Sequence, residues 1–127
     1  EGRPIFFVKI SDDPNTDDAA EPNTLYTAIH HAREPMSMSQ TIFYMWYLLE
    51  NYATDPEIQY LVDNTELFFV PCINPDGYIE NETSNPNGGG LWRKNKRDNG
   101  DQHQNTIYSR RETKAAESTL NKLFTDQ

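Results

Sequence analysis

One stretch decides how this sequence is interpreted: Leu25-Tyr26-Thr27-Ala28-Ile29-His30-His31-Ala32-Arg33-Glu34-Pro35. Its first five residues are apolar or β-branched and predict a strand. An amphipathic run begins near Met36, and Pro35 suits the first turn of a helix, where no N–H donor is needed. His31 and Glu34 are three residues apart, so an imidazole and a carboxylate can turn toward one zinc ion. Taken alone this pair is weak evidence, and a surface histidine beside a helix-start glutamate is the simpler interpretation.

The rest of the chain alternates between strand and helix patterns, which favours an α/β layer architecture. Apolar runs predict strands at residues 5–10, 25–29 and 66–73, and the last is continuous enough to be covered on both faces. Helical spacing predicts helices from near Met36, from Asp55 to about Val62 and from Arg111 to Phe124. We find no repeat and no clear boundary, so we expect a single domain over residues 1–127.

Two local patterns carry more specific expectations. Apolar residues of the long helix recur on one stripe that should face the core: Met38, Ile42, Met45, Trp46, Leu49 and Tyr52. Asn74-Pro75-Asp76-Gly77 has turn chemistry and should end the third strand. The polar, glycine-rich stretch from Glu80 to about Asn105 then predicts a loop, with Leu91-Trp92 docking it onto the body.

Composition excludes several function classes. The chain has 127 residues and a formal net charge of −9, which repels phosphate backbones and argues against a nucleic-acid partner. No apolar run approaches the roughly 18 residues of a membrane span. No signal-like segment follows Glu1, and this does not show whether one was removed. Cys72 is the single cysteine, so no internal disulfide forms.

The order of four motifs resembles the carboxypeptidase A family of zinc metallocarboxypeptidases. The motifs are residues 1–5 (Glu-Gly-Arg-Pro-Ile), 31–34 (His-Ala-Arg-Glu), 74–78 (Asn-Pro-Asp-Gly-Tyr) and 91–95 (Leu-Trp-Arg-Lys-Asn). Residues 109–115 also resemble the start of the family's late helix, with Arg110 where a glutamate is usual. The resemblance implies an α/β fold with a mixed sheet flanked by helices, resembling part of the zinc carboxypeptidase fold.

The resemblance also implies a zinc site and a substrate. His31 and Glu34 would be two of three Zn²⁺ ligands, Arg33 would help to bind the peptide, and Arg93 would polarise the scissile carbonyl. A guanidinium suits that role because its fixed donors match a charge that grows in the transition state. The implied activity is removal of C-terminal residues from peptides or proteins. By the same resemblance the protein is secreted or periplasmic.

The chain departs from the family pattern after Arg93. The family's Asn and Arg that grip the substrate's terminal carboxylate are replaced by residues 99–105 (Asn-Gly-Asp-Gln-His-Gln-Asn). The family's third zinc ligand, its tyrosine and its general-base glutamate would all follow Gln127. His30 should point to the other face of the strand end, and we expect His103 to be a surface residue rather than a substitute ligand. Glu112 is a poor candidate for the missing base.

Three hypotheses therefore remain open. The chain represents a zinc carboxypeptidase, as a fragment or with an internal deletion, or it is a non-catalytic relative that binds peptides or a partner in the same cleft. In the third, His31 and Glu34 make ordinary hydrogen bonds in a structural domain. An exposed sheet edge would also allow the chain to associate with itself.

Overall fold

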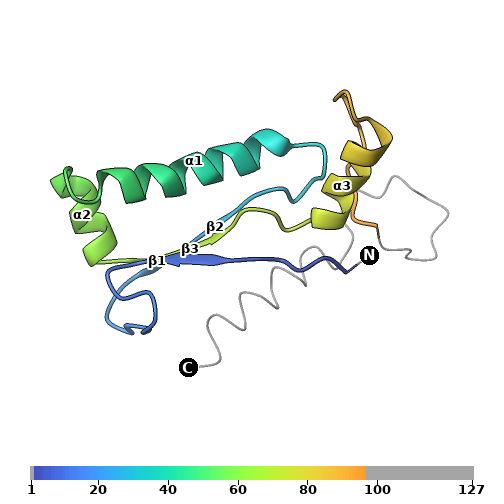
Figure 1. The fold of residues 1–127 in the computed structure, drawn as a ribbon. Helices are drawn as coiled ribbons and strands as arrows, with labels where there is room; N and C mark the ends of the chain where they lie inside the picture. The colour runs from blue at the N-terminus through green and yellow to red at the C-terminus, as the bar shows by residue number, and fades with distance from the viewer. Residues whose placement is uncertain (1, 97–127) are drawn as a thin grey trace. The chain divides into compact units, whose positions relative to one another are not determined.

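The computed structural model describes residues 2–96, which form two compact units (Figure 1). The first, which we call the sheet unit, comprises residues 6–28 and 36–72. The second, the α3 unit, comprises residues 2–5, 29–35 and 73–96. The predicted helix at residues 111–124, His103 and Glu112 lie outside the described residues.

The sheet unit holds a three-stranded mixed sheet. Its strands are β1 (Val8–Ile10), β2 (Asn23–Thr27) and β3 (Glu66–Val70), in the order β1-β3-β2. β3 pairs antiparallel with β1 and parallel with β2. All five residues of β3 are buried, as the continuous apolar run predicted. The ladders are shorter than the apolar runs, so β2 ends at Thr27 and β3 at Val70.

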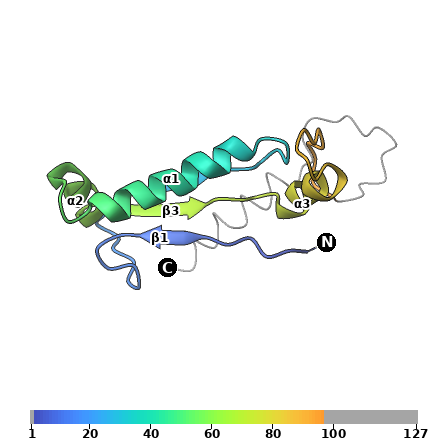
Figure 2. The same ribbon diagram turned by 45° about the horizontal axis from the view of Figure 1, so that its top comes forward.

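Two helices join β2 to β3. Helix α1 (Pro35–Asn51) lies along one face of the sheet, and α2 (Pro56–Asp63) follows it (Figures 1 and 2). Asp55 caps α2 because its carboxylate accepts the Glu57 N–H at 2.9 Å, and this satisfies a donor that the helix itself leaves unpaired. No helix within residues 2–96 is both long and apolar enough to cross a membrane.

The core of the sheet unit lies between α1, α2 and the sheet. Tyr26 of β2 stacks on Phe69 of β3 with ring centroids 4.9 Å apart, and Tyr44 of α1 meets Tyr26 edge-on at 5.2 Å. Burial is the largest effect that raises the pKa of Tyr44, to about 12. The buried hydrophobic cluster consists of Ile10, Leu48, Val62, Leu67 and Phe69.

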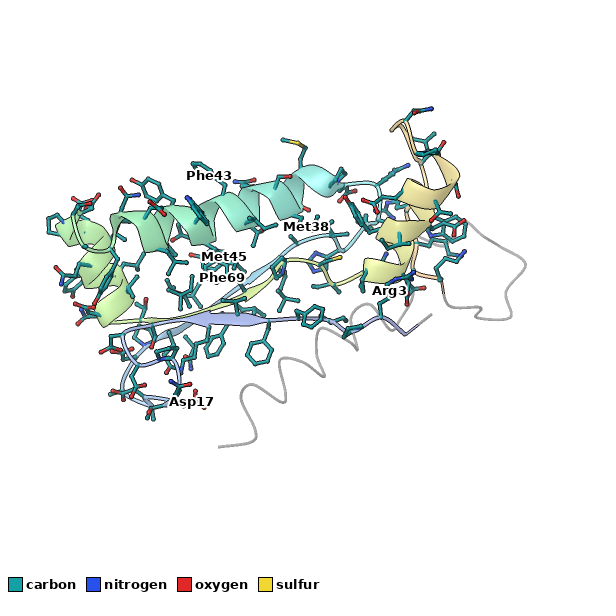
Figure 3. All side chains as sticks on the ribbon, viewed as in Figure 1. Arg3, Asp17, Met38, Phe43, Met45 and Phe69 are labelled. Atoms are coloured by element: carbon teal, nitrogen blue, oxygen red, sulfur yellow. The ribbon has the colours of Figure 1, made fainter. Side chains whose placement is uncertain are left out.

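The stripe predicted for α1 was partly wrong. Met45 and Tyr52 pack on the core, but Ile42, Trp46 and Leu49 are 49%, 62% and 62% exposed. Tyr44 and Leu48 take the inward positions instead. In Figure 3 Met45 lies between α1 and Phe69, whereas Phe43 projects from the opposite side of the helix. Residues 42–49 are apolar on every side, so their spacing alone does not select the buried face.

A buried ion pair ties the acidic loop of residues 11–22 to the sheet. Lys9 Nζ of β1 lies 2.6 Å from Glu66 Oε1 of β3, and the two side chains are 8% and 2% exposed. Lys9 also donates to Asp17 in the loop, at 2.8 Å. Burial lowers the pKa of Lys9, but its hydrogen bonds to Asp17 and Glu66 outweigh this, so its pKa is raised overall.

Lys9→Met should lower the free energy of unfolding by about 3–5 kcal/mol, because it leaves the Glu66 carboxylate buried without its cation. Asp17→Asn is the matched control. It removes the exposed partner of the same lysine and should cost less than about 1 kcal/mol. Urea unfolding followed by circular dichroism measures both. If Lys9→Met cost no more than Asp17→Asn, the buried pair would not stabilise the sheet.

Candidate functional site

The chain enters the candidate site through a strained residue. Ile29 has φ 46°, a left-handed conformation that β-branched residues rarely adopt, and its side chain is 1% exposed. Such a conformation costs about 1–3 kcal/mol and persists only where neighbouring contacts hold it. Here the Ile29 carbonyl accepts the Asn74 N–H at 3.1 Å. This strained residue immediately precedes His30 and His31.

A tight turn brings the imidazole of His31 to the carboxylate of Glu34. The Glu34 N–H donates to the His31 carbonyl at 3.1 Å, closing a turn over residues 31–34. In this turn His31 Nδ1 lies 3.0 Å from both Glu34 oxygens. The His31 side chain is 20% exposed and that of Glu34 is 51% exposed, so the pair is open to solvent.

Arg93 reaches the same place from a distant part of the chain. Its backbone carbonyl accepts the Ala32 N–H at 3.0 Å, and its Nη2 lies 3.4 Å from His31 Nδ1. A guanidinium only donates, so this approach suits an Nδ1 that carries a lone pair, the form that binds a metal. The hydrogen bond to Glu34 suits the protonated Nδ1 instead. The structure thus brings His31, Glu34 and Arg93 together.

Two further candidate residues of segment 30–34, His30 and Arg33, are exposed. Arg33 occupies a central position of the turn. Arg33 is therefore accessible to a peptide, although its side chain does not join the His31–Glu34 pair.

Residues 74–77 begin a helix rather than a simple turn. The structure places α3 at Pro75–Ser84, where the sequence predicted a turn followed by a loop. Asn74 is its N-cap, because Asn74 Oδ1 accepts the Gly77 N–H at 3.0 Å, and Pro75 occupies the first turn. An Asn-Pro-x-Gly pattern suits both a turn and a helix start, which explains the error. The predicted loop begins only at Asn85.

Segment 91–96, which carries Arg93, lies against α3 at a glycine. A Cβ on Gly77 would stand 2.5 Å from the Lys94 carbonyl oxygen and 2.7 Å from Asn74 Oδ1. Gly77 is buried and has no positive φ. Glycine is therefore needed here because it has no side chain, and not because of its backbone conformation. Lys96 adds an ion pair to Glu80 of α3 at 2.8 Å, and the Lys96 hydrogen bond lowers the pKa of Glu80.

The N-terminal arm also attaches to α3. Asp76 accepts the Gly2 N–H at 2.9 Å and the Arg3 guanidinium at 2.7 Å (Arg3 is labelled in Figure 3). The Gly2 hydrogen bond is the largest effect on the pKa of Asp76, which is lowered. A hollow of about 250 Å³ beside this contact is lined by Arg3, Asn74, Asp76 and Lys96, among others. Neither His31 nor Glu34 lines it, so it is separate from the candidate site.

The donor set suits part of a zinc site. Two ligands at about 2.1 Å from a tetrahedral ion are about 3.4 Å apart, and the His31 and Glu34 atoms are 3.0 Å apart. A shift of a few tenths of an ångström would therefore admit an ion between an imidazole nitrogen and a carboxylate oxygen. Within residues 2–96 no group of three or more His, Cys, Asp or Glu side chains is placed to hold a metal. The described residues thus offer two candidate ligands, His31 and Glu34, where a protein zinc site needs about three.

Comparison with known proteins identifies the family. The zinc carboxypeptidase family model matches residues 1–125. The chain belongs to the zinc carboxypeptidase family. It is 35% identical over 99 residues to a zinc carboxypeptidase of Saccharothrix mutabilis subsp. capreolus, covering 78% of this chain and 22% of that protein. It is 34% identical over 82 residues to carboxypeptidase D of Homo sapiens, covering 65% of this chain and 6% of that protein. The chain spans less than a quarter of the length of either relative.

Solved structures confirm the fold class. Carboxypeptidase A from Helicoverpa armigera matches with a TM-score of 0.57 at 27% identity, over 77% of this chain and 22% of that protein. Thrombin activatable fibrinolysis inhibitor matches with a TM-score of 0.62 at 20% identity, over 84% of this chain and 24% of that protein. The α/β fold with a mixed sheet is thus a part of the zinc carboxypeptidase fold.

Sequence reasoning identified one of the two asparagines that hold the site of this zinc carboxypeptidase family member together, because it took residues 74–78 as a structural turn that holds the loop presenting Arg93. Asn74 was assigned to a turn, and Asn81 was not singled out. Asn81 belongs to a polar stretch that was interpreted as a loop, and its partner Trp92 is 11 residues away. The Asn-Pro-Asp-Gly pattern contained a signal for the role of Asn74, since asparagine before proline is a common helix start. No local signal in the sequence pointed to Asn81.

Gly77→Ala should destabilise the protein by about 1–3 kcal/mol, although alanine is the better helix former, because the added Cβ meets the Lys94 backbone. Glu82→Ala, an exposed change in the same helix, is the control and should stay within about 0.5 kcal/mol. Urea unfolding measures the difference. Equal or greater stability of Gly77→Ala would show that α3 and segment 91–96 do not pack this closely.

Proposed function

We propose that this chain is the part of a zinc metallocarboxypeptidase that supplies two zinc ligands, His31 and Glu34, and the oxyanion-stabilising Arg93. The observation that supports this proposal most directly is that Nδ1 of His31 lies 3.0 Å from the Glu34 carboxylate and 3.4 Å from Arg93 Nη2. Family membership supports hydrolysis of C-terminal residues of peptides or proteins as the reaction of the complete enzyme.

The residues present divide the work by their chemistry. When bound, Zn²⁺ supplies a Lewis acid for the scissile carbonyl and makes water more acidic. The Glu34 carboxylate and the His31 imidazole would hold the ion. The Arg93 guanidinium would donate hydrogen bonds from its fixed fork of N–H groups to the developing oxyanion. Arg33, exposed on the turn, is available to bind the peptide.

A second function, peptide or partner binding without turnover, is favoured by a different observation. Residues 2–96 offer no third His, Cys, Asp or Glu side chain beside His31 and Glu34. A third ligand must therefore come from outside residues 2–96 or from a second chain. A secreted or periplasmic location and self-association at the β1 or β2 edge of the described sheet stay predictions.

The purified chain should bind one Zn²⁺, and both His31→Ala and Glu34→Gln should weaken that affinity by roughly tenfold or more, because each removes a ligand. His30→Ala is the matched control, since it removes the neighbouring exposed imidazole. Isothermal titration calorimetry gives affinity and stoichiometry together. If the folded chain holds no specific zinc, the metal site is wrong and the non-catalytic function is favoured.

Arg93→Ala should lower peptide turnover by roughly a hundredfold or more, with little change in zinc affinity, because the guanidinium acts on the oxyanion and not on the metal. Lys94→Ala removes the adjacent cation and should leave turnover nearly unchanged. If the chain does not turn over peptide, the affinity for a peptide with a free C-terminus is measured instead. The role assigned to Arg93 is wrong if neither quantity changes.

A further inference from the structure

The side chain of Asn81, near the end of α3, holds the backbone of Trp92 by two hydrogen bonds. Asn81 Oδ1 accepts the Trp92 N–H at 2.8 Å, and Asn81 Nδ2 donates to the Trp92 carbonyl at 2.7 Å. One amide side chain thus pairs with both polar groups of a residue 11 positions away, much as a neighbouring strand would. Trp92 immediately precedes Arg93.

The segment that carries Arg93 needs such a partner because residues 91–96 have no helix or strand. Backbone outside regular structure is fixed only where side chains or loops satisfy its donors and acceptors. Asn81 does this on one side of Arg93, at Trp92. On the other side, the Arg93 carbonyl accepts the Ala32 N–H of the loop that contains His31, at 3.0 Å.

Gly90 makes room for this contact. A Cβ at Gly90 would stand 2.7 Å from Asn81 Cβ and 2.8 Å from Asn81 Cγ. Gly90 has no positive φ, unlike Gly88 and Gly89, so its missing side chain is needed for the approach of Asn81 rather than for the turn. The pairing of Asn81 with Trp92 therefore depends on glycine at position 90.

Further contacts orient the Trp92 side chain on the same helix. The Trp92 indole N–H donates to the Lys94 carbonyl at 2.6 Å. Lys96 Nζ lies 4.9 Å from the centroid of the Trp92 ring and also pairs with Glu80, which precedes Asn81 on α3. These contacts secure the segment, and the Asn81 amide adds hydrogen bonds to both backbone polar groups of Trp92, the residue before Arg93.

We propose that Asn81, with Gly90 opposite, is the positioning residue that holds Arg93 beside His31. The role assigned to Arg93 rests on the proposed function, but the positioning itself does not. A wide guanidinium on a long side chain stabilises an oxyanion only if its backbone is held in place, because geometric errors of about an ångström cost much of the effect. Asn81 supplies that restraint from a helix and leaves the Arg93 side chain accessible.

The first test is amide hydrogen exchange by NMR in Asn81→Ala. Exchange at Trp92 and at Ala32 should become roughly tenfold faster or more, because two hydrogen bonds next to Arg93 are lost. Exchange at the Asn74 amide, which donates to the Ile29 carbonyl, should not change. An unchanged rate there would show that the rest of the α3 unit is intact. Asn85→Ala, the same change one turn further along, is the matched control and should leave all three amides unchanged.

Unchanged protection at Ala32 in Asn81→Ala would overturn the proposal, since Asn81 would then be a local contact of α3 only. Two further variants keep the test decisive if Asn81→Ala does not fold. Gly90→Ala keeps the amide but displaces it, and should reproduce the faster exchange at Ala32. Asn81→Asp keeps the acceptor for the Trp92 N–H and loses the donor, so its effect should be intermediate.

The second test is a double-mutant cycle on turnover, or on peptide affinity in a chain without turnover. Asn81→Ala should act in the same direction as Arg93→Ala, and the double variant should be no worse than Arg93→Ala alone. Zinc affinity should stay within about twofold. Fully additive losses would overturn the proposal. A wild-type chain that binds neither zinc nor peptide contradicts the proposed function, and exchange at Ala32 then decides the role of Asn81 by itself.

Discussion

The candidate site depends on the hydrogen bonds of Asn74. Its N–H donates to the Ile29 carbonyl, its Nδ2 to the His30 carbonyl at 3.5 Å, and its Oδ1 caps α3 at Gly77. One buried amide thus joins the strained entrance of the loop that carries His31 and Glu34 to the start of the helix that supports Arg93. The two side-chain bonds reach backbone groups outside the regular hydrogen bonds of strand and helix, so replacing the Asn74 side chain would remove both.

Small residues allow these irregular segments to lie close together. Gly77 and Gly90 leave space for backbone and amide atoms that any side chain would displace, and Ala32 is buried where its N–H meets the Arg93 carbonyl. The left-handed conformation of Ile29 shows the cost of this arrangement, since a β-branched residue adopts it only under restraint. The functional side chains are thus carried on loops, and those loops are held by α3 and by the Asn74 bonds.

The described residues bring three groups with complementary chemistry together. A turn over residues 31–34 presents an imidazole and a carboxylate to one position, and Arg93 adds a permanent cation to it. These are the groups that bind a metal and stabilise an oxyanion, but two ligands leave zinc coordination incomplete. The chain spans less than a quarter of the length of either relative compared above.

The sequence by itself determined the α/β class, the position of α1 and α2, the burial of β3 and the family, because these follow from local periodicity, caps and short motifs. It also indicated that His31 and Glu34 can meet, since three residues of a turn suffice to bring them together. Tertiary structure alone decided which side of α1 is buried, because residues 42–49 of that helix are apolar on every side. It also decided that Asn81 and Gly90 support Arg93, because their contacts join residues whose spacing in the chain carries no signal.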